Sequence, residues 1–423
     1  MSRVRKLIAA AASFAFLVQV ETAFPQSADP SREAHRALGE GRYLDAVDWA
    51  RDAAFGSGAP DRGSAVFSTW LQIHPFIGGT LDPLAIEPGP PTEPLDPARA
   101  ERYRRADVRD AVREIAARAA GTRLVILNEA HHSPRDRAFA LEVARALRPL
   151  GYSILAAEAF TNYVDADEGR RALAALAADG FPRRRTGHYV ADPMFGDFVR
   201  QALAMGYRPA AYEATGSDHS GGWPERIARR EQAQAEALAE ILRRDPQVRL
   251  LVYVGFSHAA EAPVASAEGE DEWMASRLKR ISGIDPLTID QTVIDETSAR
   301  RRAYRDLAAP RLGRRPGILF LGGAPMVEGQ YAGAVDLQVV HPPLRLVRGR
   351  PDWLLRIGRR PVAIPRRLLS ATGRRLVQAF AANEPADAIP LDQIVVEAGR
   401  PPPPLMLPRG AVRWQVQDPA TRR

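Results

Sequence analysis

The chain has 423 residues, of which 45% are hydrophobic and 26% are charged, so it can bury the cores of two or three globular domains. Its formal charge of +7 comes from 58 basic residues, all arginine except Lys6 and Lys279, which are scattered rather than gathered into a stripe with aromatic residues. This distribution argues against nucleic acid as a partner. The absence of cysteine excludes disulfides, thiolate metal sites and cysteine nucleophiles.

Residues 1–28 have the pattern of a signal peptide. A basic start, MSRVRK, precedes the apolar run LIAAAASFAFLVQV, and small residues near Ala23 and Ala28 offer cleavage points. The alternative is an anchoring helix that is never removed, but the run is short for the ~20 apolar residues of a full span. We therefore expect a mature soluble protein in the periplasm or outside the cell, with no stable membrane span after signal removal.

The residues after the leader are expected to form a helical cap over residues 29–81. Small and apolar residues in 31–58 have helical spacing on either side of Gly39 and Gly41, which predicts two antiparallel helices that resemble one tetratricopeptide unit. A single unit of this kind must pack on something else. Residues 82–97 contain six prolines and are expected to be an irregular linker.

Strand and helix patterns alternate in residues 98–312. A helix is expected over 98–120, and helical stretches separate five short apolar runs that predict strands: 123–128, 152–157, 207–212, 249–255 and 285–289. This alternation predicts an α/β fold with a mostly parallel sheet covered by helices. Residues 313–423 instead contain short strand-like runs between Pro and Gly, and we expect a β-rich C-terminal region there.

Each of these apolar runs is followed by an acidic residue or a histidine. Because the carboxyl ends of parallel strands lie along one edge of a sheet, we expect these side chains to line a shared functional cleft. In chain order they are Glu129 with His131 and His132, then Glu158, Glu213, His258 and Asp290. His219 follows Glu213 in a Gly-rich turn, and the candidates for substrate binding are His131, Glu213, His219 and Glu231.

The remaining histidines carry weaker signals. His188 lies in a loop that could cover the site. His35 and His74 lie outside the sheet region and are assigned no role, and His341 lies unassigned in the β-rich region.

The order of the strand-end residues resembles a known superfamily. The run Asn128-Glu129-Ala130-His131-His132, Glu158 in AAEAF and His258 in VGFSHA are similar to motifs of erythromycin esterases, ChaN haem-uptake proteins and Tiki metalloproteases. The resemblance covers residues 121–292 and implies a parallel sheet with a Glu/His site at its edge.

Two details of the resemblance bear on residue roles. His132 matches the histidine spacing of the esterases and His131 that of the ChaN proteins, while Asn128 stands where the family has glycine. Arg230 and Glu231 resemble the Arg-Asp pair that opens a helix in the esterases, with Glu in place of Asp.

These residues allow hydrolysis of esters or amides in a small-molecule or peptide substrate. Without a metal, His132 would take a proton from water, and Glu129 or Glu158 would orient it. Arg230 and His258 would then stabilise the developing oxyanion. The metal-dependent alternative places Zn, Mn or Co, with one position open for water, on Glu129, His132, Glu158 and His258. Serine hydrolase chemistry is excluded because the sequence has no G-x-S-x-G elbow.

An alternative from another functional class is binding of haem or a small ligand without turnover, as in the ChaN branch. Imidazoles and tyrosinates bind haem iron, and the candidates near the strand ends are His131, Tyr163, Tyr189 and Tyr253. Haem binding and hydrolysis stay open as alternatives at the level of sequence.

Overall fold

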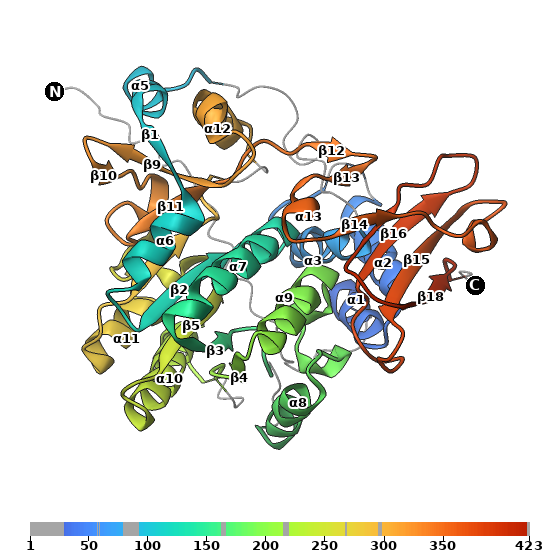
Figure 1. Cartoon of the computed structure of the whole chain (residues 1–423), viewed down its shortest axis with the longest axis horizontal. Coiled ribbons are helices and arrows are strands. Elements are labelled where there is room, and N and C mark those ends of the chain that lie inside the picture. The colour runs from blue at the N-terminus through green and yellow to red at the C-terminus, as the bar shows by residue number, and fades with distance from the viewer. Residues whose placement is uncertain are drawn as a thin grey trace.

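A large mixed sheet forms the centre of the molecule, in which the strand order is β1-β9-β11-β8-β2-β5-β3-β4, with β10 paired to β9 (Figure 1). This computed structural model describes residues 29–420 except 57, 59, 79–92, 162–165, 215–219, 267–268 and 295–297. The predicted signal peptide therefore lies outside the described residues, as does His219. None of the helices within the described ranges is long and apolar enough to cross a bilayer.

The parallel part of the sheet agrees closely with the predicted strands. Its members are β2 (Leu124–Glu129), β3 (Tyr152–Ala157), β4 (Arg208–Ala210), β5 (Arg249–Gly255) and β8 (Leu287–Asp290). Pairing is parallel between β8 and β2, β2 and β5, β5 and β3, and β3 and β4. The expected α/β fold with a mostly parallel sheet is confirmed.

Helices cover both faces of this sheet, and the side chains of each strand alternate between the two cores. Val125 and Leu127 join one core with α6 (Ala111–Ala119), α7 (Pro134–Leu147) and α9 (Pro193–Ala204). Leu124 and Ile126 join the other core with α10 (Trp223–Arg244) and α11 (Met274–Ser282). Burial on both faces explains why these strands are continuous apolar runs.

The other edge of the sheet differs from the prediction in two respects. The single helix expected over 98–120 is two helices, α5 (Pro97–Arg105) and α6, separated by strand β1 (Asp107–Asp110). The expected boundary at residue 313 does not separate two sheets, because β9 (Gly317–Leu321), β10 (Ala324–Pro325) and β11 (Leu337–Val340) extend the central one. β11 runs parallel to β8, and β9 is antiparallel to both β11 and β1.

The N-terminal helices are α1 (Pro30–Gly39), α2 (Tyr43–Phe55) and α3 (Ala65–Ile73), followed by the short 3-10 helix η1 (His74–Ile77). Their apolar residues belong to the same core as α7 and α9. Tyr43 anchors them by donating its hydroxyl to the carbonyl of Ala191, at 3.1 Å. The cap is therefore continuous with the α/β core. Most of the predicted linker, 82–97, lies outside the described residues.

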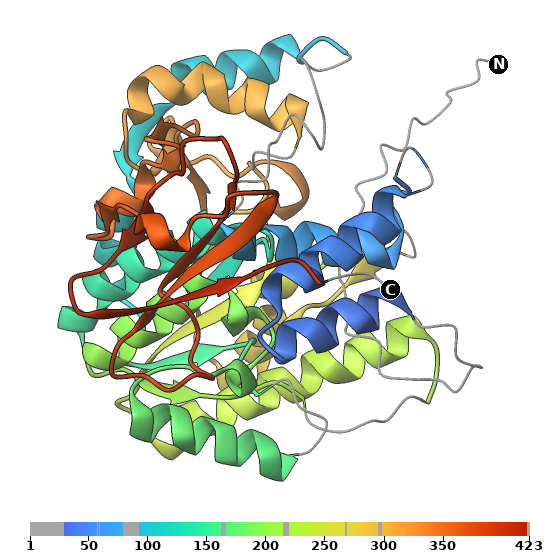
Figure 2. The same ribbon diagram turned by 90° about the vertical axis from the view of Figure 1, so that its right-hand side faces the viewer.

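The C-terminal residues form small antiparallel units beside the cap, as Figure 2 shows. The largest is the sheet of β16 (Asp392–Glu397), β15 (Arg374–Ala381) and β18 (Val412–Gln417). Gln417 ties it to the cap by donating to the carbonyl of Gly41 at 2.6 Å and accepting from the amide of Leu44 at 3.3 Å.

The remaining elements are short pairs of strands and peripheral helices. They comprise β6 (Val264–Ser266) with β7 (Gly269–Asp271), β12 (Leu346–Val347) with β13 (Arg350–Pro351), β14 (Arg360–Val362) with β17 (Leu405–Leu407), and the helices α8 (Ala166–Asp179), α12 (Ala299–Leu312) and α13 (Trp353–Arg356).

Candidate active site at the carboxyl edge of the sheet

Strands β2, β5 and β3 lie side by side and bring two glutamates to the same edge. Glu129, the last residue of β2, is in register with Gly255, the last residue of β5. Glu158 follows β3 directly, and its amide donates to the carbonyl of Tyr253 on β5 at 3.0 Å. The sheet thus places Glu129 and Glu158 on either side of the end of β5.

Glu129 orients the first histidine of the site. Its Oε1 lies 3.0 Å from His131 Nδ1, and a carboxylate only accepts, so Nδ1 donates and leaves Nε2 as the base nitrogen of a neutral imidazole. Fully buried Arg137, on α7, donates to both oxygens of Glu129 at 2.8 and 2.9 Å. Burial by itself would raise the pKa of Glu129, but Arg137 and His131 outweigh it and lower that pKa to about 2.

Arg137 also fixes the backbone of the turn that follows β2. It donates to the carbonyl of His131 at 2.7 Å and to Asp192, the N-cap of α9, at 2.7 Å. Asp136 holds the same turn, accepting from the amide of Ala130 at 3.0 Å and from the hydroxyl of Ser133 at 2.7 Å. These hydrogen bonds hold the turn in the conformation in which the His131 imidazole contacts Glu129. His132, the expected base, is the next residue and half-buried, and the Glu129 contact belongs to His131.

A second histidine is oriented in the same way from the other face of the sheet. His258 lies in the 3-10 helix η5 (Phe256–Ala259) directly after β5. Its Nδ1 is 2.8 Å from Oε2 of Glu231 on α10, and that oxygen also accepts from the amide of Met274 at 2.8 Å. The Nε2 atom of His258 points to Glu158, whose Oε1 is 3.4 Å away, and to Arg230, whose Nη1 is 3.3 Å away.

Arg230 connects the acidic residues of this half of the site. It donates to Glu158 Oε1 at 2.6 Å and, through Nε, to Glu213 Oε1 at 2.9 Å. Gln234, one turn along α10, donates to both oxygens of Glu213 at 3.1 Å. The guanidinium therefore lies between Glu158, Glu213 and His258, with its side chain 18% exposed.

Glu158 joins the two halves of the site. Its second oxygen accepts from the amide of Gly255 at 2.7 Å. A Cβ atom on Gly255 would lie 2.6 Å from His131 Nε2 and 3.1 Å from Glu158 Oε2, so the His131 ring and Glu158 both lie against this glycine. A side chain at residue 255 would therefore fill the space where the imidazole lies.

The charges at this edge set the protonation states of Glu158 and His258. Burial alone would raise the pKa of Glu158, but His258, Arg230 and His131 hold it well below its usual range. Burial alone would lower the pKa of His258, but the carboxylates of Glu231 and Glu158 outweigh it and raise that pKa above 6.5. His258 is thus favoured as an imidazolium next to an ionised Glu158.

Tyr189 packs against the His131 ring. The sequence indicated Tyr189 only as a candidate haem ligand. It lies in the 3-10 helix η4 (Tyr189–Ala191), and its ring stacks on the imidazole with centroids 3.9 Å apart and planes 15° apart. His188 contacts Tyr189 edge-on at 5.1 Å, and His35 of α1 contacts His188 at 4.4 Å. The cap thus reaches the site through His35, to which the sequence assigned no role.

Asp290, the acidic residue that ends the fifth predicted strand, has a structural role. Asp290 accepts hydrogen bonds from Asn128 at 2.9 Å and from Gln338 at 3.0 Å, which ties β8 to β2 and β11. Asn128, which replaces the glycine of the resembled family, also accepts from the amide of Gln291 at 2.8 Å. His341, unassigned by sequence, lies 3.0 Å from the Gln291 side chain. This buried network supports the strands beneath the site.

The side chains of the site do not fit the metal centre expected on Glu129, His132, Glu158 and His258. Among the described residues, no group of three or more histidine or acidic side chains is placed to hold a metal ion. The reason is that Arg137 and Arg230 already bond to the carboxylates and supply the positive charge that balances them.

The two described tyrosines among the expected haem ligands are both buried. The ring of Tyr189 stacks on the His131 imidazole. Tyr253 is also enclosed in the core between Phe195 and Phe198. The third expected ligand, Tyr163, lies outside the described residues.

The solved structures that resemble this chain include bacterial toxin and effector proteins. No protein-family model and no curated protein matches the chain. Among solved structures, RRSP, a MARTX toxin effector domain from Vibrio vulnificus CMCP6, is 16% identical over 62% of this chain and 56% of its own, with a TM-score of 0.34. A structure described as bacterial protein toxins is 15% identical over 63% and 57%, with a TM-score of 0.35.

The type III effector HopBA1 is 18% identical over 44% of this chain and 84% of its own, with a TM-score of 0.30. The chain thus spans a little over half the length of RRSP. Likenesses this weak assign no function, and the resemblance to the esterase, haem-uptake and metalloprotease superfamily stays a prediction.

Proposed function

We propose that this protein hydrolyses ester or amide bonds with two histidines, one acting as the base and the other as the acid. The observation that carries the proposal is that His131 and His258 each turn Nδ1 to a glutamate, at 3.0 and 2.8 Å. The His131 ring and Glu158 Oε2 both lie against Gly255, and His258 Nε2 lies 3.4 Å from Glu158 Oε1. Two imidazoles that are each oriented by a carboxylate are suited to base and acid catalysis in one site.

In the first step, Nε2 of His131 takes a proton from a water molecule as the water oxygen attacks the carbonyl carbon of the substrate. Glu129 holds the imidazole in the tautomer this step requires and stabilises the imidazolium that forms. Arg230 lies beside the same space and stabilises the negative charge that develops on the carbonyl oxygen. The base role thus falls to His131 in place of His132.

In the second step, the bond to the leaving group breaks and the leaving oxygen or nitrogen takes a proton. His258 is the proposed donor, because Glu231 and Glu158 raise its pKa and favour its protonated form. The products are a carboxylic acid and an alcohol or amine. The substrate class is a small molecule or peptide, as the sequence predicts.

The test is a screen of the purified protein against panels of esters and amides, with the variants His131→Ala and His258→Ala. We expect wild-type activity to fall by ~100-fold or more in both variants. His74→Ala is the matched control, because His74 lies at the end of α3, in the cap, and packs against Trp70. Activity that survives in both site variants, with folding intact by circular dichroism, would refute the proposal.

We further propose that this activity is exported. The support is the leader pattern of residues 1–28. A fusion of residues 1–35 to a reporter that folds only in the periplasm tests this directly. A reporter that stays in the cytoplasm would contradict it.

A further inference from the structure

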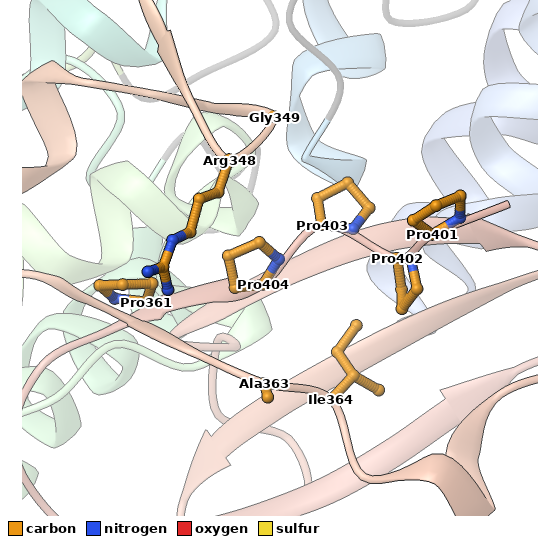
Figure 3. Close-up of a pocket in the computed structure, with 9 residues that line it drawn as sticks. All are labelled: Arg348, Gly349, Pro361, Ala363, Ile364, Pro401, Pro402, Pro403 and Pro404. Carbon is orange, nitrogen blue, oxygen red and sulfur yellow. The ribbon is translucent and has the colours of Figure 1, made fainter.

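A cavity lies in the C-terminal region, among elements that the proposed reaction does not use. Its volume is about 520 Å³, within the range typical of small-ligand pockets. Figure 3 shows the residues that line it, which are Arg348, Gly349, Pro361, Ala363, Ile364 and Pro401 to Pro404.

The side chains that line this pocket are aliphatic apart from Arg348. Pro401 to Pro404 lead into β17, and β17 pairs with β14, so the proline run lies opposite Ala363 and Ile364. A proline has no backbone N–H and a fixed φ angle, so this wall donates no hydrogen bonds and is already ordered before a ligand arrives. Such a surface favours an aliphatic group over a polar one.

Arg348 is the one charged residue in the lining. Figure 3 shows its side chain extending from the tip of the β12–β13 hairpin toward Pro361 and Pro404. Among the described residues, no hydrogen bond, ion pair or ring contact is recorded for its guanidinium. An arginine aimed over an aliphatic surface, without a carboxylate of the protein beside it, is complementary to an anion from outside.

The backbone at Arg348 supports the same conclusion independently. Arg348 and Gly349 are the two central residues of the hairpin turn, with φ angles of 53° and 78°, as in a type I′ turn. Asn, Asp and Gly are favoured at the first of these positions, whereas an arginine there is strained. An arginine in this backbone conformation, with its side chain directed into a pocket, is consistent with a role in binding.

We propose that this pocket binds an amphipathic carboxylate, a small molecule with an aliphatic body and one anionic end. The carboxylate pairs with the Arg348 guanidinium, and the aliphatic chain lies against the proline rings and Ile364. Leu346 and Val347 of β12, the strand that leads to Arg348, are 55% and 43% exposed.

Calorimetric titration with decanoate tests the proposal, with decanol and acetate as probes that carry the chain or the charge alone. Decanoate is expected to bind the wild type more tightly than either. In Arg348→Asn the affinity for decanoate is expected to fall about tenfold or more, to that of decanol, since a charge-assisted hydrogen bond is lost. Arg409→Asn is the matched control, because Arg409 is exposed in the same region and does not line the pocket.

Two further measurements distinguish a loss of ligand binding from a loss of folded structure. Because asparagine suits the turn better than arginine, Arg348→Asn is expected to keep or raise Tm while it loses affinity. Ala363→Phe fills the pocket and is expected to abolish binding of decanoate.

Four outcomes would overturn the proposal: no binding of decanoate to the wild type, equal binding to Arg348→Asn, equal binding of decanol, or a lower Tm in Arg348→Asn. Tighter binding of a leucine-rich peptide with a free carboxylate would show that the occupant is a polypeptide instead.

Discussion

Replacement of Gly255 by alanine probes the central contact of the proposed site. The backbone of Gly255 has φ −87° and ψ 142°, which alanine adopts without strain, so the effect comes from the added methyl group alone. That methyl carbon would lie 2.6 Å from His131 Nε2. Ordinary contacts between such atoms are about 3.5 Å, so the imidazole has to retreat by about 1 Å.

The ring has little freedom to accommodate this shift. Tyr189 stacks on one face at 3.9 Å, Phe256 lies edge-on at 5.1 Å, and Nδ1 is held 3.0 Å from Glu129. A displacement of ~1 Å in a catalytic group costs on the order of 100-fold in rate, or about 2.7 kcal/mol in the activation barrier. We therefore expect kcat/KM to fall by ~100-fold, with KM changing less than kcat.

The assay measures kcat and KM on the best substrate from the ester and amide screen. Gly39→Ala is the matched control, because Gly39 ends α1 and a Cβ atom there meets nothing within 4 Å. Thermal unfolding confirms that both variants fold. If Gly255→Ala keeps wild-type kcat/KM, the His131 ring does not act where it lies beside Glu158, and the proposed base is wrong.

Three further predictions concern the groups around the two histidines. Glu129→Gln removes a carboxylate whose pKa falls from 4.5 to about 2 on folding, so unfolding in urea at pH 7 should show a loss of about 3 kcal/mol. That contribution to the free energy of unfolding is complete above pH 4.5 and is lost as the pH falls toward 2. The variant should therefore lack this part of the wild-type loss of stability in acid. A variant whose free energy of unfolding falls with pH as in the wild type would contradict the prediction. Glu231→Gln removes the main anion that raises the pKa of His258, so the alkaline limb of the kcat/KM profile should move to lower pH; an unmoved limb would exclude His258 as the acid. Tyr189→Ala should lower kcat/KM about tenfold and Tyr189→Phe should not, because phenylalanine keeps the ring that stacks on His131; equal losses would assign the effect to the hydroxyl.

The elements that could be predicted from sequence are those whose signal is local. Strands β2, β3 and β5 are apolar runs buried on both faces, and the polar residue after each run marks the edge of the sheet. Glu129, Glu158 and His258 could therefore be assigned to one site before any coordinates. Strand β1 could not be predicted, because its four residues, DVRD, have no apolar pattern and depend on pairing with β9.

Other parts of the site depend on tertiary contacts that no pattern in the sequence predicts. His131 and His132 are adjacent, and the turn held by Asp136 and Arg137 determines which of them meets Glu129. Arg137 itself has the appearance of a surface residue at the start of an amphipathic helix. It is buried because Glu129 and Asp192, 8 and 55 positions away, surround it.

The position of β1 at the edge of the sheet has a consequence for biosynthesis. Its pairing partner β9 begins at Gly317, so a strand near residue 107 leaves the ribosome more than two hundred residues before the strand that covers it. Pairings this distant in sequence form slowly and leave backbone donors and acceptors exposed in the nascent chain. Strand β1 can pair with β9 only late in translation. A chaperone that shields this edge of the sheet until then would raise the yield of folded protein.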